Sequence, residues 1–114
     1  MTADNSIQAL IIKIIEKTTQ GKMAWKKGAK VNSFSYSMIN ASIMMHLEDI
    51  NDATYVFFSV FDETGQVIDF KGELFSWDPN MDQFPLSYLY SIAKRKALKI
   101  DETVANISSY LDCL

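Results

Sequence analysis

The spacing of hydrophobic residues changes along the chain, and each spacing predicts a different element. Between Ile7 and Ile15 the apolar residues recur every three or four positions, which is the stripe of an amphipathic helix. Gly21 follows the stripe and suits the left-handed residue that commonly ends a helix. The pattern therefore predicts a helix over about residues 5–20.

From residue 33 onward, apolar and polar residues alternate, as they do in a half-buried strand. The alternation includes Phe34 and Tyr36, and it resumes at Ile43 after a change of phase across Ile39–Ala41. A tight turn or a bulge is expected at that change, so this stretch predicts two strands. The acidic segment Glu48–Asp52 predicts a solvated loop.

The residues Asp62–Gly65 have the composition of a type I turn followed by glycine in the left-handed position of a bulge. Such a turn pairs Asp62 with Gln66 and sets Phe58 opposite Phe70. One face of the hairpin is then wholly apolar, whereas a slip of one residue would mix the two faces. The other face of this predicted register carries Tyr55, Phe57, Phe61, Val67, Asp69, Lys71 and Glu73.

Pro85 suits the first position of a helix, and the loop before it covers Trp77–Asp82. Apolar residues then recur at helical spacings as far as Leu111, which predicts one long helix over about residues 85–112 with a kink near Ile100. The predicted fold class is α+β: an N-terminal helix, a meander of three or four antiparallel strands, and a long C-terminal helix. Both helices are expected on one face of the sheet. With 114 residues, the chain is expected to form a single domain, residues 1–114.

The same sequence predicts a cytoplasmic protein that does not enter a membrane. No apolar run reaches the roughly 18–20 residues that a membrane-spanning helix needs, and Met1–Ser6 carry no positive charge of the kind that opens a signal peptide. Cys113 is the only cysteine, so an internal disulfide is excluded.

No constellation of residues in the sequence indicates an enzyme or a cofactor site. The four glycines form neither a phosphate-binding loop nor a dinucleotide fingerprint. His46 is the only histidine, and its strand position favours an exposed or hydrogen-bonded side chain. Glu48, Asp49 and Asp52 could bind a hard cation, but their spacing matches no EF-hand. The expectation is a protein with no metal and no cofactor.

Charge is distributed unevenly, although the net charge is only −3. Residues 1–47 carry six lysines and two acids, whereas residues 48–82 carry nine acids and one lysine. The basic residues form two clusters, one around Trp25 after the first helix and one on the C-terminal helix. An exposed Trp25 or Tyr36 could stack on a base, which makes nucleic-acid binding the alternative function. The residues of this alternative are Lys22, Trp25, Lys26, Lys27, Lys30, Lys94, Arg95, Lys96 and Lys99. The acidic pI of about 5.0 opposes that alternative.

The mixed face of the hairpin is the preferred candidate for function. Its aromatic centre and charged edge have the composition of a protein–protein interface. If a helix covers this face it is ordinary core, and if it is open the expected partner is another protein or a second copy of the chain in a homodimer. The sequence therefore predicts a non-enzymatic interaction or regulatory accessory module. The predicted interaction surface is Tyr55, Phe57, Phe61, Val67, Asp69 and Lys71.

Three parts of the chain resemble small uncharacterised bacterial proteins that are often encoded on mobile elements. They are Lys22 with Trp25, the turn Asp62–Gly65 between two aromatic strands, and a run of apolar and basic residues over 89–98. The resemblance covers nearly the whole chain. It implies a bacterial cytoplasmic protein with a helix, a β-meander and a helix, and it implies no activity and no functional residue.

Overall fold

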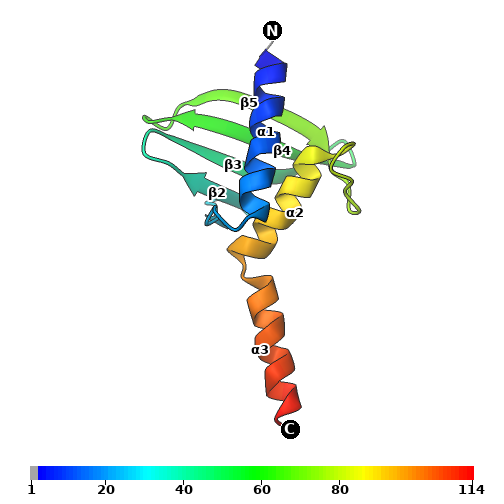
Figure 1. Cartoon of the computed structure of the whole chain (residues 1–114). Helices are drawn as coiled ribbons and strands as arrows, with labels where there is room; N and C mark the ends of the chain where they lie inside the picture. Colours follow the sequence, from blue (N-terminus) through cyan, green and yellow to red (C-terminus); the bar gives the residue numbers. More distant parts are fainter. Residues whose placement is uncertain (1–2) are drawn as a thin grey trace.

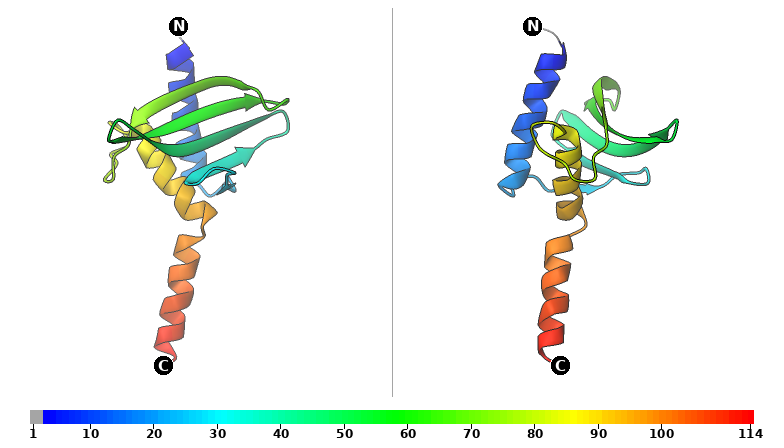
Figure 2. Two further views of the ribbon diagram at one scale, coloured as in Figure 1. Left: turned by 180° about the vertical axis from the view of Figure 1, so that it is seen from behind. Right: turned by 90° about the vertical axis from the view of Figure 1, so that its right-hand side faces the viewer.

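The computed structural model describes residues 3–114, so Met1 and Thr2 of the N-terminal segment lie outside it. Three helices and five strands follow one another along the chain, and the strands form a single antiparallel sheet in which each pairs with its neighbours in sequence. Helices α1 and α2 cover one face of the sheet (Figure 1), and the view from behind in Figure 2 shows the other face uncovered. The predicted α+β class with an antiparallel sheet is confirmed. The elements are α1 (Ala3–Thr19), β1 (Lys26–Lys27), β2 (Ser33–Ser37), β3 (Ala41–Ile50), β4 (Ala53–Asp62), β5 (Val67–Leu74), α2 (Pro85–Ala97) and α3 (Ile100–Asp112).

The first helix forms where its apolar stripe predicts it, and the four isoleucines of that stripe from Ile7 to Ile15 are buried, whereas Leu10 is 37% exposed. Its C-terminus is a Schellman motif, because the Lys22 amide donates to the Lys17 carbonyl and the Gly21 amide to the Thr18 carbonyl, both at 3.0 Å. Gly21 has φ +74°, a conformation that strains residues with a side chain. The predicted role of this glycine is confirmed.

The core lies between α1, α2 and the covered face of the sheet. Apolar side chains of the two central strands are fully buried here, among them Met45 on β3 and Phe58 on β4. Trp25 is only 4% exposed, and its indole N–H donates to the Thr18 hydroxyl at 3.0 Å. A buried tryptophan needs such a partner for its N–H. Trp25 is therefore a core residue, and the predicted role in stacking on a base is wrong.

The sheet has five strands rather than three or four. The additional strand is the two-residue β1, which pairs with Ser35 and Phe34 of β2. The acidic segment Glu48–Asp52 is also not the predicted loop, because β3 continues through it to Ile50. Asn51 and Asp52 alone make the turn, with φ of 51° and 67°. Asn and Asp tolerate this left-handed conformation, so a two-residue hairpin turn replaces the loop.

The turn between β4 and β5 has the predicted form. The Asp62 amide donates to the Gln66 carbonyl at 2.9 Å, and Gly65 has φ +87°. The Asp62 carboxylate accepts hydrogen bonds from the Thr64 hydroxyl at 2.6 Å and from the amides of Thr64 and Gln66. The Thr64 hydroxyl first, and then these amides, lower the pKa of Asp62 below its usual value of 3.8. The turn is thus fixed by its own side chain.

Beyond this turn the predicted register is wrong. Phe61 lies opposite Val67 as expected, but an irregularity between Val60 and Phe61 shifts the pairing, so that Phe58 lies opposite Lys71 instead of Phe70. A bulge adds one residue to a strand, and one residue is enough to exchange its two faces. Phe70 and Leu74 therefore belong to the uncovered face. The side chains placed on the helix side are Asp69, Lys71 and Glu73.

Glu73 gives a physical reason for the shifted register. Its carboxylate accepts hydrogen bonds from the Leu86 amide at 3.2 Å and from the Ser87 amide at 2.9 Å, in the first turn of α2. The buried Ser87 hydroxyl donates to the same carboxylate at 3.1 Å. These amides have no partner within the helix, and a negative charge here also matches the helix dipole. In the register predicted from the sequence, Phe70 would lie on the helix side of the sheet and Glu73 would point away from α2.

The prediction of a single C-terminal helix is wrong. Helix α2 begins at Pro85 as expected and ends at Ala97, and α3 begins at Ile100. Lys99 between them has φ 53°, in the left-handed region. A continuous helix requires negative φ at every residue, so the helix is interrupted at Lys99, beside the kink that was predicted near Ile100. Helix α3 then extends away from the sheet (Figures 1 and 2).

Candidate functional site

The uncovered face of the sheet is apolar and aromatic where it crosses β3, β4 and β5. Side chains of one face alternate along a strand, and the observed pairing places seven large side chains together here with Val67. Phe70 is 62% exposed, and Val67 and Leu74 are each about half exposed. We call this surface the open face. Its residues are Met44, His46, Tyr55, Phe57, Phe61, Val67, Phe70 and Leu74.

Phe57 lies at the centre of the open face, in a stack of three rings. Its centroid is 5.5 Å from that of His46 on β3 and 6.2 Å from that of Tyr55, and both pairs are nearly parallel at 29°. Gly72 is the partner of Phe57 on β5, and a Cβ atom there would lie 2.7 Å from the Phe57 ring. The ring thus covers the glycine, and the glycine is required for this close approach.

The open face includes four of the six residues predicted for the interaction surface. Tyr55, Phe57, Phe61 and Val67 lie on it, whereas Asp69 and Lys71 lie on the opposite face because of the shifted register. Phe70 and Gly72 take the places that were expected for Asp69 and Lys71, and Leu74 takes the place that was expected for Glu73. The polar residues on this face include Ser35 and Ser37 of β2, Ser42 and Glu48 of β3, and Ser59 of β4, which lies between Met44 and Phe70.

His46 is part of the ring stack. Its side chain is 12% exposed, and its Nε2 atom lies 3.3 Å from a carboxylate oxygen of Glu48. Its Nδ1 atom is buried without a hydrogen-bond partner. Asp49, another of the acids considered for a cation, accepts a hydrogen bond from the Thr54 hydroxyl at 2.6 Å. Among the side chains of residues 6–114, no three His, Cys, Asp or Glu gather closely enough to hold a metal ion.

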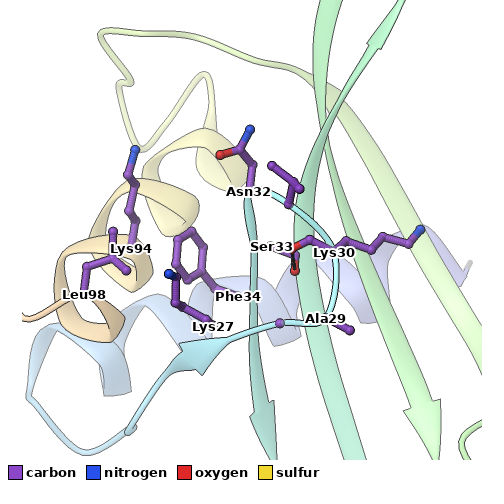
Figure 3. Close-up of a pocket in the computed structure, with 10 residues that line it drawn as sticks. Lys27, Ala29, Lys30, Asn32, Ser33, Phe34, Lys94 and Leu98 are labelled. Atoms are coloured by element: carbon purple, nitrogen blue, oxygen red, sulfur yellow. Dashed lines mark hydrogen bonds between the residues drawn. The ribbon is translucent and has the colours of Figure 1, made fainter.

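Three of the candidate basic residues meet at a cavity of about 570 Å³ beside the loop between β1 and β2. Figure 3 shows Lys27 and, on α2, Lys94 beside Phe34, whereas the side chain of Lys30 extends from the loop away from them. No acidic side chain lines the cavity. Lys94, from the basic cluster on the C-terminal helix, thus lines the same cavity as Lys27 and Lys30, from the cluster that follows α1. The candidates that do not line this cavity are Lys22, Trp25, Lys26, Arg95, Lys96 and Lys99.

Arg95 has a structural partner, because its guanidinium forms an ion pair with Asp101 in the first turn of α3. Both side chains are at least half exposed, and an ion pair this exposed contributes little to stability. It does reduce the free positive charge on this side of α2.

No protein-family model, curated protein or solved structure matches the chain. The resemblance to small bacterial proteins therefore stays a prediction. None of the helices in the described part of the chain is long and apolar enough to cross a membrane.

Proposed function

We propose that this chain is a non-enzymatic protein-interaction module, with a regulatory or accessory role in the cytoplasm, and that the open face is its binding surface. One observation carries the proposal: neither α1 nor α2 covers the aromatic face of the sheet. Antiparallel sheets commonly leave one face in water, but that face is then usually polar. The hydrogen bonds of Glu73 explain why positions 70 and 74 face outward, but they do not require apolar residues at those positions.

The size of the exposed surface supports the same function. The exposed parts of Val67, Phe70 and Leu74 alone amount to about 300 Å². With the half-buried rings of the central stack, the patch reaches the size at which surface patches on single proteins are often functional. Aromatic residues at the centre with a polar border are typical of protein interfaces. The expected partner is a protein with a flat apolar contact surface.

Phe70→Glu tests this function. Phe70 is the most exposed aromatic residue of the open face. A carboxylate buried there without a partner in an interface is costly, so the variant should bind the partner at least about 100-fold more weakly. Ile39→Glu is the matched control, because Ile39 is fully exposed at the turn between β2 and β3, away from the open face. Tagged proteins would be purified gently from the native cells and analysed by native mass spectrometry.

The expected result is a stoichiometric partner that the wild type and Ile39→Glu retain and Phe70→Glu loses. Thermal unfolding of all three proteins checks that the fold is intact. Retention of the partner by Phe70→Glu, or a wild-type protein that carries no stoichiometric partner, would contradict the proposed binding surface.

The cavity with three lysines favours nucleic-acid binding as a second candidate function. Phosphate contacts need grouped positive charge, and Lys27, Lys30 and Lys94 supply it from two segments that are far apart in sequence. The burial of Trp25 removes one of the two aromatic residues that were expected to stack on a base, and the other, Tyr36, is partly buried and does not line the cavity. We therefore rank it below protein binding.

Lys94→Glu tests the second candidate, with Lys13→Glu on the exposed side of α1 as its control. If the cavity binds phosphates, Lys94→Glu should weaken binding to a labelled DNA or RNA oligonucleotide at low salt at least about 10-fold, and added salt should weaken binding by the wild type steeply. Fluorescence anisotropy measures both effects. Equal affinities for the two variants, or no binding at low salt, would exclude nucleic-acid binding by this cavity.

A further inference from the structure

Helix α3 carries an apolar stripe with the spacing of a coiled-coil seam. Its members recur at intervals of four, three and four residues, which is the pattern of a and d positions in heptads. Past the half-buried Ile100, every member is more than half exposed. We call this stripe the α3 seam. Its residues are Ile100, Val104, Ile107 and Leu111, and Leu114 continues the spacing just past the end of α3 at Asp112.

Nothing in the described chain covers the α3 seam. No residue of α3 is buried, and both figures of the whole molecule show α3 standing clear of the sheet and of α1 (Figures 1 and 2). An isolated helix of 13 residues is marginal in water, because packing supplies most helix stability in proteins. No surface within residues 3–114 therefore supplies this packing for α3 beyond its first residue, Ile100.

The charges beside the seam limit what can cover it. The acidic residues of α3 are Asp101, Glu102 and Asp112, and residues 100–114 contain no lysine or arginine. Helices that lie on membranes usually carry basic polar faces that attract anionic lipids, so a membrane is a poor partner for α3. In heptad order Glu102 and Asp112 lie away from the seam, and only Asp101 lies beside it. Two such helices can therefore meet without facing rows of like charge.

The geometry points to a second copy of this chain as the partner, and we propose that α3 pairs with α3 of that copy along the seam. A second copy necessarily brings the same heptad spacing and the same nearly neutral flanks, and symmetric pairs are the commonest oligomers. The seam and Tyr110 beside it expose about 500 Å². A pair would bury about 1,000 Å², which is the lower limit for a specific interface, so the dimer should dissociate on dilution.

Ile107→Glu in the full chain tests the pairing. Ile107 lies in the middle of the seam, and a carboxylate there would be buried between two apolar helices. Analytical ultracentrifugation over a range of concentrations should show a wild-type dimer and at least about a 100-fold larger dissociation constant for Ile107→Glu. Ser109→Glu is the matched control, because it places the same charge on the opposite side of α3 and should leave the dimer intact.

Two further measurements separate this proposal from other arrangements. Hydrogen exchange of the α3 amides should slow as the wild-type concentration rises and should stay fast in Ile107→Glu, while the β4 amides stay protected in both. Phe70→Glu should form the same dimer as the wild type. This result would also separate a failure of α3 pairing from a failure of the open face as a binding surface.

Three results would overturn the proposal: a wild-type chain that is monomeric at millimolar concentration, a dimer that Ile107→Glu leaves intact, or a dimer that Phe70→Glu dissociates. The last result would mean that the open face, rather than a second α3, receives the seam.

Discussion

Phe58→Ala should lower the free energy of unfolding by about 3–5 kcal/mol, whereas Phe70→Ala should lower it by less than about 1 kcal/mol. The two phenylalanines are on neighbouring strands. Phe58 is fully buried between the sheet and the helices, and Phe70 is 62% exposed on the open face. Truncation of Phe58 removes apolar contacts and leaves a cavity, but truncation of Phe70 only removes area from an exposed surface. The larger loss is a substantial share of the 5–15 kcal/mol that typically stabilises a domain.

Urea unfolding of both variants measures this difference, and it also tests the register of β5 directly. The register predicted from the sequence pairs Phe58 with Phe70 on the buried face, and in that arrangement the two substitutions would cost similar amounts. If Phe58→Ala does not fold, Phe58→Leu provides a milder change at the same position, with an expected loss of about 1–2 kcal/mol. Similar losses at positions 58 and 70 would contradict the observed register.

Glu73→Ala should lower the free energy of unfolding by about 2–3 kcal/mol, because hydrogen bonds to a charged group are stronger than those between neutral groups. The substitution leaves the amides of Leu86 and Ser87 and the buried Ser87 hydroxyl without their acceptor. Glu73→Gln should cost less than Glu73→Ala, because one amide oxygen can still accept a hydrogen bond. Hydrogen exchange at Leu86 and Ser87 should be faster in both variants.

Asp69→Ala is the control for Glu73. Asp69 lies on the same strand and the same face, but its carboxylate accepts a hydrogen bond only from the neighbouring Phe70 amide among the contacts observed here. The expected loss is less than about 1 kcal/mol. An equal loss for Asp69→Ala and Glu73→Ala, with unchanged exchange in the first turn of α2, would show that Glu73 does not stabilise this helix.

The elements themselves could largely be predicted from the sequence, because periodicity and turn residues are local signals. Helix α1, its end at Gly21, the turn at Asp62–Gly65 and the start of α2 at Pro85 all follow from neighbouring residues. The register of β5 could not be predicted in this way. Residues 69–74 alternate in either register, and the interaction that favours the observed one joins Glu73 to residues 13 and 14 positions further along the chain.

The candidate surface was only partly predictable for the same reason. The β4 residues Tyr55, Phe57 and Phe61 are on the open face because their alternation is fixed within one strand. Phe70 and Leu74 were missed because their side depends on the bulge. Gly72 was the available signal: a glycine inside a strand often marks a close approach, and pairing it with the aromatic Phe57 rather than with Val56 would have produced the observed register.

The order of the strands in the sheet has a consequence for how the protein folds. Every strand pairs only with its neighbours in the chain, and turns of a few residues connect β2 through β5. Closing such short loops is fast and loses little entropy. The slow step is then the meeting of α1 and α2, which are separated by the entire sheet in sequence. During synthesis the sheet can form next to α1 before α2 has been synthesised. The core is completed only when the last third of the chain has been synthesised.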